Sequence, residues 1–142
     1  MRSPGIHHTG MTVSDLQRSI EFYELFGYEV AARIEEEGEE VDRGTGVDGA
    51  HLSVAVLERG PSRLELIQYA SPAGGAPAHT ANNAIGSAHI CLHVDDIDEA
   101  VAELSAKGVE FQSEPIYHES GIRWVYCRDP DGVTAELLQV LE

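Results

Sequence analysis

The chain has 142 residues, of which 25 are acidic and 9 are lysine or arginine, so its net charge is -16 at pH 7. This length fits one domain, or two half-size modules that share a core. The negative charge argues against nucleic-acid and anionic-membrane partners, because binding to them needs cationic contacts to phosphate. No run approaches the roughly 18 apolar residues of a membrane span, and the first residues lack the apolar segment of a secretory signal. We therefore expect a cytoplasmic protein.

The first half of the sequence predicts a strand, a helix and three further strands. A period of two over residues 5–13 places His8 and Gly10 on the same face of the first strand. Ser14 or Asp15 caps the helix, and Gly27 ends it. We expect the further strands at residues 28–34, 50–57 and 63–69, with the acidic run 35–40 as a solvated loop or strand end and a turn-rich stretch at 44–49.

The second half repeats this order. A strand over residues 88–94 leads into a helix that is capped by Asp95 or Asp96 and ends at Gly108. We expect the remaining elements to be a strand at 109–112, a loop around His118, a strand at 123–127, a turn at 129–132 and a last strand at 133–140. Cys91 and Cys127 lie in apolar runs without metal-site spacing, which predicts buried free thiols in a reducing compartment.

The chain contains the same module twice. A shift of 81 positions places His8 on His89 without a gap, and a shift of 71 positions places Glu65 on Glu136. Self-similarity of this kind indicates a structural repeat. We therefore predict an α+β fold of two βαβββ modules, at residues 1–70 and 87–142, joined by a Pro-, Gly- and Asn-rich linker at 71–86.

Each module carries one histidine on its first strand and one glutamate on its last. A single glutamate between leucines is most simply an outward-facing strand residue, and a lone strand histidine is most often structural. The recurrence of both at equivalent places changes that interpretation, because two related modules can bring four such residues together. Imidazoles and carboxylates bind divalent transition metals, so the pattern predicts a metal site.

The sequence resembles the vicinal oxygen chelate superfamily, which includes glyoxalase I, methylmalonyl-CoA epimerase, extradiol dioxygenases and bleomycin-binding proteins. The similarity covers nearly the whole chain. Its motifs are His8-Thr9-Gly10, Val13-Ser14-Asp15-Leu16, Ser19-Ile20-Glu21-Phe22-Tyr23, Leu64-Glu65-Leu66, His89-Ile90, Val94-Asp95-Asp96-Ile97, Asp129-Pro130-Asp131-Gly132 and Glu136-Leu137.

This resemblance implies a U-shaped mixed sheet around one divalent metal held by His8, Glu65, His89 and Glu136. The metal would be Ni, Zn, Co or Mn in preference to Fe(II). The resemblance also implies a homodimer, whose metal site lies within one chain or between two. Among members, the ligand set is nearest to glyoxalase I, and the stretch from residue 71 to 91 resembles methylmalonyl-CoA epimerase.

We therefore expect a metal-dependent isomerase or lyase that acts on a small molecule. The metal would chelate two neighbouring oxygens of the substrate, and Glu136 or Glu65 would move a proton through an enolate. The alternatives are an antibiotic-binding resistance protein without turnover and an extradiol-type dioxygenase.

Other candidate residues have weaker support. His93 shares a face with His89, and His118, Arg123 and Trp124 belong to a region that could cover a substrate. His7 is excluded as a ligand, because its counterpart in the second module is an alanine.

Overall fold

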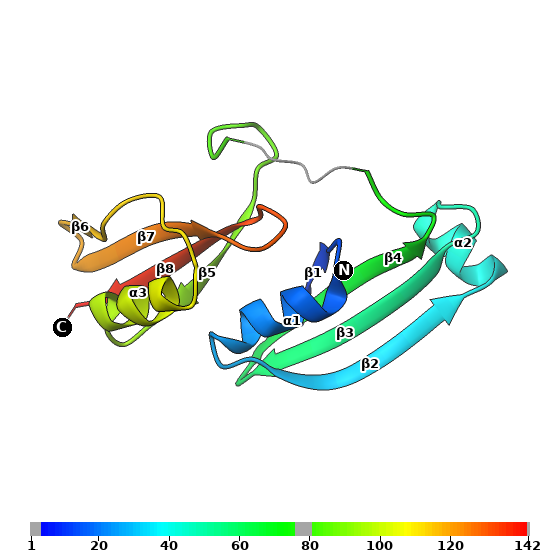
Figure 1. Cartoon of the computed structure of the whole chain (residues 1–142), viewed down its shortest axis with the longest axis horizontal. Coiled ribbons are helices and arrows are strands. Elements are labelled where there is room, and N and C mark those ends of the chain that lie inside the picture. Colours follow the sequence, from blue (N-terminus) through cyan, green and yellow to red (C-terminus); the bar gives the residue numbers. More distant parts are fainter. Residues whose placement is uncertain (1–3, 76–80, 142) are drawn as a thin grey trace. The chain divides into compact units, whose positions relative to one another are not determined.

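Each half of the chain forms its own unit around one four-stranded mixed sheet (Figure 1). The computed structural model describes residues 4–75 and 81–141. The two units are Met1–Ala76 and Pro77–Glu142. The predicted modules at residues 1–70 and 87–142 each fall inside one unit, and the predicted linker includes residues 76–80, which lie outside the described residues.

The first unit has six elements, and its sheet has the strand order β1-β4-β3-β2. Strand β1 runs parallel to β4, whereas the other neighbours are antiparallel. Helix α1 lies along one face of this sheet (Figure 1). In chain order the elements are β1 (Thr9–Thr12), α1 (Leu16–Glu24), β2 (Glu29–Glu37), α2 (Glu39–Thr45), β3 (His51–Arg59) and β4 (Ser62–Ser71).

The second unit repeats this topology with the strand order β5-β8-β7-β6. Strand β5 is parallel to β8, as β1 is to β4. No helix in residues 4–75 and 81–141 is long and apolar enough to cross a membrane. The predicted α+β fold with a repeated module is confirmed. The elements are β5 (His89–His93), α3 (Ile97–Ala106), β6 (Ile116–His118), β7 (Ile122–Arg128) and β8 (Thr134–Val140).

The long helices of both units begin at equivalent aspartates. The carboxylate of Asp15 accepts a hydrogen bond of 3.0 Å from the backbone N–H of Arg18. The carboxylate of Asp96 accepts one of 2.9 Å from the N–H of Glu99. A side-chain acceptor satisfies an N–H that has no partner in the first helical turn. In each module, the second of the two predicted candidates is therefore the cap.

A glutamine on the last strand holds each of these helix starts. The side-chain oxygen of Gln68 accepts a hydrogen bond of 2.7 Å from the N–H of Leu16, and that of Gln139 accepts one of 3.3 Å from the N–H of Ile97. The amide of Gln139 also donates to the backbone oxygen of Asp95. Both helices are thus fixed to the strand that carries the module's glutamate.

The core of each unit lies between the sheet and its long helix. In the first unit the side chains of Ile20 and Leu66 are almost fully buried, and in the second unit those of Ile97 and Leu137 are. Because strand residues alternate between the two faces, Leu66 and Leu137 on the helix side direct the preceding glutamates to the opposite face. The apolar pattern of β4 and β8 therefore decides where the carboxylates point.

Two tight turns connect the strands next to these glutamates. Gly60 and Pro61 alone join β3 to β4, and Gly60 has a φ of 54°. Such a positive φ at the first central position suits a two-residue hairpin loop. In the second unit the carboxylate of buried Asp129 accepts hydrogen bonds from the N–H groups of Asp131 and Val133. The second turn agrees with the turn predicted at 129–132, and the first lies between the strands predicted at 50–57 and 63–69.

The stretch between β2 and β3 differs from the prediction. Edge strand β2 extends to Glu37, in agreement with the predicted strand end, whereas residues 39–45 form helix α2, where a loop and a turn were expected. Glu39, Glu40 and Asp42 lie in the first turn of α2, where negative charge stabilises the positive end of the helix dipole. Gly46 ends the helix with a φ of 71°.

The edge of the second sheet also differs. The strand predicted at 109–112 is reduced to a single bridge between Phe111 and Cys127. The strand that pairs with β7 is instead β6, in the segment predicted to be a loop. Pro115 has no N–H to donate to a ladder, and continuous pairing begins only after it.

We expect Asp96→Ala to lower the free energy of unfolding by about 1 kcal/mol, because it removes the side-chain cap of α3. Urea denaturation followed by circular dichroism measures this change. Asp95→Ala is the matched control, since Asp95 contributes its backbone oxygen to Gln139 and that oxygen remains after substitution. Equal stability of the two variants would contradict the capping role of Asp96.

Candidate metal centre

The register of the parallel strands places each glutamate beside its module's histidine. Glu65 on β4 is the partner of Gly10 on β1, and Glu136 on β8 is the partner of Cys91 on β5. His8 and His89 lie two residues before these partners, so they share the face of the sheet with the glutamates. The repeat detected in the sequence therefore extends to the pairing of the first and last strands, which is equivalent in the two units.

The first pair joins His8 and Glu65 in the first unit. Nδ1 of His8 is 3.3 Å from Oε1 of Glu65, and the two side chains are 37% and 23% exposed. His8 lies directly before β1, with Gly10 beside its ring. A methyl group at Gly10 would meet the His8 ring and Ile67 only at ordinary contact distances of 3.9–4.0 Å. The carboxylate and the imidazole are thus accessible from one side.

His7 lies against this pair, although the sequence comparison excluded it. Its Nδ1 is 2.9 Å from Nδ1 of His8. His7, His8 and Glu65 each offer one possible ligand atom, and these three atoms lie within 4.8 Å of one another, close enough to hold one metal ion. The guanidinium of Arg63 is 3.0 Å from Nε2 of His7. Because arginine can only donate, that nitrogen accepts and Nδ1 of His7 carries the proton. In this state His7 donates to His8.

This arrangement of hydrogen bonds fits a cation site. If Nδ1 of His8 accepts from His7, it has no proton to give to Glu65. The single lone pair of Nδ1 is then engaged by the His7 N–H, so a metal ion held between this nitrogen and the carboxylate oxygen, which lie 3.3 Å apart without a shared proton, would displace that hydrogen bond. Two electron-rich atoms in such contact suit a shared cation, and both atom types bind divalent metals.

The second pair joins His89 and Glu136 in the second unit. Nε2 of His89 is 2.9 Å from Oε2 of Glu136, and the side chain of Glu136 is 14% exposed. The ring of Tyr126 contacts that of His89, with centroids 5.3 Å apart. Trp124 follows at 5.0 Å from Tyr126. Aromatic rings therefore line one side of this pair, and the structure joins the four predicted ligands as two pairs, one in each unit.

Cys91 is not buried, contrary to the prediction. It lies on the same face as Glu136 and is exposed, whereas Cys127 is buried as expected. Partial burial raises the pKa of the Cys91 thiol to about 11, and the charge of Glu136 and a hydrogen bond to its carboxylate add to this effect. The pKa of Cys127 is also raised to about 11, mainly by burial. Neither thiol has the lowered pKa of a nucleophile.

Apolar side chains continue the face on which Glu65 lies. Ile67 and Tyr69 follow it at alternate positions of β4 and pack against the cluster of Ala50, Leu52 and Val54. In the second unit, Trp124 is opposite Leu138 on the strands that carry Tyr126 and Glu136. Each polar pair is thus bordered by an apolar wall, as small-molecule sites commonly are.

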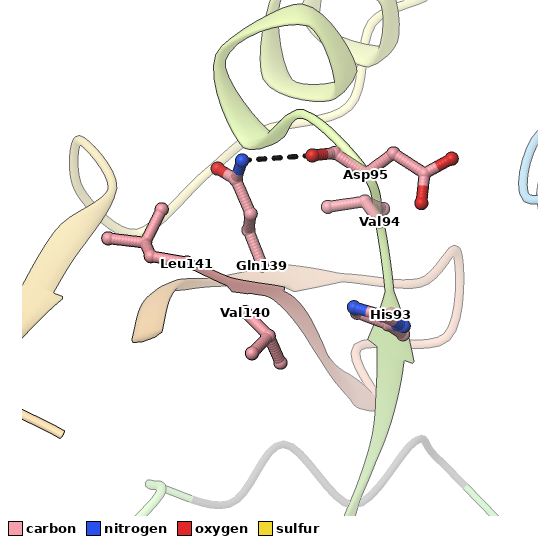
Figure 2. A pocket seen from close by; sticks show the side chains of 6 residues that line it. All are labelled: His93, Val94, Asp95, Gln139, Val140 and Leu141. Atoms are coloured by element: carbon pink, nitrogen blue, oxygen red, sulfur yellow. Dashed lines mark hydrogen bonds between the residues drawn. The ribbon is translucent and has the colours of Figure 1, made fainter. Parts of the chain in front are cut away.

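His93 lines a separate pocket at the other end of β5. The pocket has a volume of about 510 Å³ and is lined by His93, Val94, Asp95, Gln139, Val140 and Leu141. Figure 2 shows the side chain of Gln139 reaching the backbone oxygen of Asp95 across it. His93 is four positions from His89, which is roughly 13 Å along the strand. His93 therefore shares the strand of His89 without joining the pair.

The other candidates of the second unit have different positions. Both terminal nitrogens of Arg123 donate to the carboxylate of Asp98 on α3, so Arg123 belongs to the helix side of the sheet. This hydrogen bond lowers the pKa of the Asp98 carboxyl. His118 is exposed on β6 and is hydrogen-bonded to Ser120. By register, Trp124 and His118 share the face of Glu136, whereas Arg123 does not.

Comparison with known proteins places the chain in a family. It belongs to the Glyoxalase/Bleomycin resistance protein/Dioxygenase superfamily, whose family model matches residues 5–137. The resemblance predicted from the motifs is thereby confirmed. The superfamily contains proteins of several activities, so membership defines the fold and leaves the reaction to be argued from the site.

Three relatives illustrate this range. The chain is 34% identical over 145 residues to a 2-epi-5-epi-valiolone epimerase from Actinomyces sp., covering 95% of this chain and 79% of that protein. It is 29% identical to the mitochondrial methylmalonyl-CoA epimerase of Homo sapiens, covering 94% and 73%. A crystal structure of a glyoxalase family protein from Bacillus cereus has a TM-score of 0.92 at 30% identity and covers 100% of this chain and 97% of that one.

We expect Cys91 to react slowly with iodoacetamide at pH 8, although it is exposed. With a pKa of about 11, its thiolate fraction is about 10⁻³ there, roughly two hundredfold below that of an ordinary cysteine. The alkylation rate should rise with pH until the pH passes the raised pKa, because only the thiolate reacts. Mass spectrometry of chelator-treated protein between pH 7 and 10 measures the rate. Fast alkylation at pH 7 would contradict the assigned environment.

Proposed function

We propose that this protein is a metal-dependent isomerase that moves a proton next to a carbonyl group of a small molecule, most simply as an epimerase. The observation that carries the proposal is the equal register of the two pairs, His8 with Glu65 and His89 with Glu136. Two relatives named as epimerases are matched over 79% and 73% of their own length, whereas two lactoylglutathione lyases are matched over 48% and 43% of theirs. This difference supports an epimerase over a lyase.

The four side chains of these pairs would hold one divalent metal, Ni, Zn, Co or Mn in preference to Fe(II). The ligands come from one chain or from both chains of a homodimer, which we also propose. When bound, such a metal acts as a Lewis acid that polarises substrate oxygens. Neutral imidazoles and carboxylates are suited to this role because they leave positions free for substrate when they number three or four.

The chain's own residues would carry the proton. A carboxylate of Glu65 or Glu136 takes the proton from the carbon beside the carbonyl and returns it, which for an epimerase means to the other face. Such a general base contributes typically ~10² to 10⁴-fold to the rate. The apolar walls of Ile67 and Trp124 would border the reacting carbon, so that a proton reaches this carbon through the carboxylate and not directly from bulk water.

We expect the purified protein to bind one equivalent of Ni²⁺, Co²⁺, Zn²⁺ or Mn²⁺ per site and to lose it in His8→Ala and His89→Ala. Removal of one imidazole from a four-ligand site should weaken binding at least tenfold. Elemental analysis after gel filtration, with isothermal titration of the chelator-treated protein, measures this.

His51→Ala is the matched control, because His51 is a strand histidine whose partners are Glu35 and Glu37 on the neighbouring strand β2. A protein that binds no divalent metal would favour a small-molecule-binding protein without turnover. Activity that requires Fe(II) and consumes oxygen with a catechol would favour a dioxygenase.

We expect Glu136→Ala to abolish turnover, with a loss of at least ~10²-fold in kcat, because it removes a carboxylate that would serve as a metal ligand or as the base. The assay follows the exchange of the proton next to the carbonyl in D₂O by NMR. Its substrates are chosen from the relatives' names and the resemblance: methylmalonyl-CoA, 2-epi-5-epi-valiolone and the methylglyoxal–glutathione adduct.

Glu103→Ala is the control for this experiment, because its carboxylate pairs with Lys107 on the outside of α3. Full activity of Glu136→Ala would contradict the assignment of Glu136. If the wild-type protein exchanges the proton of none of the three substrates, the proposed substrates are wrong. The prediction of metal binding would still stand.

A further inference from the structure

The two His/Glu pairs differ at one position that the register makes equivalent. The residue opposite Glu65 is Gly10, and the residue opposite Glu136 is Cys91. Partners in neighbouring strands direct their side chains to the same face. The first carboxylate therefore has no side chain beside it at this position, whereas the second has a thiol.

We infer that Cys91 is a positioning residue that holds Glu136 in place, and that Glu65 is consequently the carboxylate that moves the proton. Cys91 and Glu136 are register partners whose side chains share one face of the sheet, which places the thiol to donate its proton to this carboxylate. The first part of this inference concerns only Cys91 and Glu136, and the second part rests on the proposed function.

The surroundings of the two carboxylates agree with this difference. Glu136 is 14% exposed and lies 2.9 Å from its histidine, whereas Glu65 is 23% exposed and lies 3.3 Å from its histidine. On the other neighbouring strand, Glu136 is opposite Tyr126 and Glu65 is opposite the smaller Val56. Glu136 is thus held on more sides than Glu65.

The physical effect of the thiol is a restraint on the carboxylate. A thiol is a weak donor, but a hydrogen bond to a charged acceptor is stronger than one to a neutral acceptor. An ordinary thiol keeps its proton at neutral pH, so the bond persists under working conditions. A restrained carboxylate stays in one orientation and so suits a metal ligand. A carboxylate that takes a proton from a substrate carbon must turn toward that carbon.

The hydrogen bond itself is tested by infrared spectroscopy of the chelator-treated protein. The S–H stretch of Cys91, assigned by its disappearance in Cys91→Ala, should lie at lower frequency than that of a free thiol. Glu136→Gln should shift it to higher frequency, because the amide is a weaker acceptor. Glu65→Gln is the control and should leave it unchanged. An S–H stretch at the frequency of a free thiol would overturn the first part.

The restraint is tested by substitutions at Cys91 and at Gly10, the equivalent position of the first unit. Cys91→Gly should weaken metal binding about tenfold, the lower end of the range for residues that support a ligand. Gly10→Ala should leave it within a factor of two, because the space beside Gly10 accommodates a methyl group without strain. Gly10→Cys places a donor beside Glu65 and should slow proton exchange about fivefold while the metal stays bound.

The assignment of roles is tested with amide variants, which keep an oxygen ligand but not the base. Glu65→Gln should abolish proton exchange and keep its metal, whereas Glu136→Gln should keep its metal and a measurable share of exchange. The reverse result would overturn the second part and leave the first intact. If neither variant nor the wild type exchanges protons, the proposed function fails, and the infrared and metal-binding results still decide the role of Cys91.

Discussion

The parallel pairing of the first strand with the last is the constraint on which each half of the molecule depends. It brings His8 into contact with Glu65, 57 positions further along the chain, and His89 into contact with Glu136, 47 positions further along. Parallel neighbours need a long connection between them, and here the helix and two strands provide it. The side-chain period of two makes this pairing decisive, because a shift by one residue would turn Glu136 into the core and Leu137 out of it.

The same pairing explains why polar ligands and an apolar core share one strand. Leu66 and Leu137 are directed to the helix, and the glutamates directly before them are directed away. Gln68 and Gln139 then fix the helix starts to these strands. Packing, capping and ligand placement therefore rest on one register in each unit, and the candidate site inherits its rigidity from the core behind it.

Much of this could be predicted from the sequence because it is periodic. The repeat identified the four paired residues, and the helix caps and the turn at 129–132 followed from local chemistry at Asp15, Asp96 and Asp129. The exposure of Cys91 was missed although the period of two already placed it on the face of His89; the apolar neighbours were given more weight than the alternation.

The remaining differences arose where contacts are not periodic. His7 joins the first pair because the chain before β1 is irregular and does not alternate, so comparison of equivalent positions could not detect it. Helix α2 depends on packing of Val41 and Val47 against the sheet, and β6 depends on where pairing restarts after Pro115. These are tertiary effects that a single sequence does not display.

The shift between the modules falls from 81 positions at the helix to 71 at the last strand, so the first module holds ten more residues between these two points. Those residues include α2 and the extended end of β2, with their acidic side chains. This difference in length includes the segment after the outermost strand β2, where neither the parallel pairing nor the core is disturbed. In a duplicated fold of this kind, that segment is where one half can acquire a recognition surface that its twin lacks.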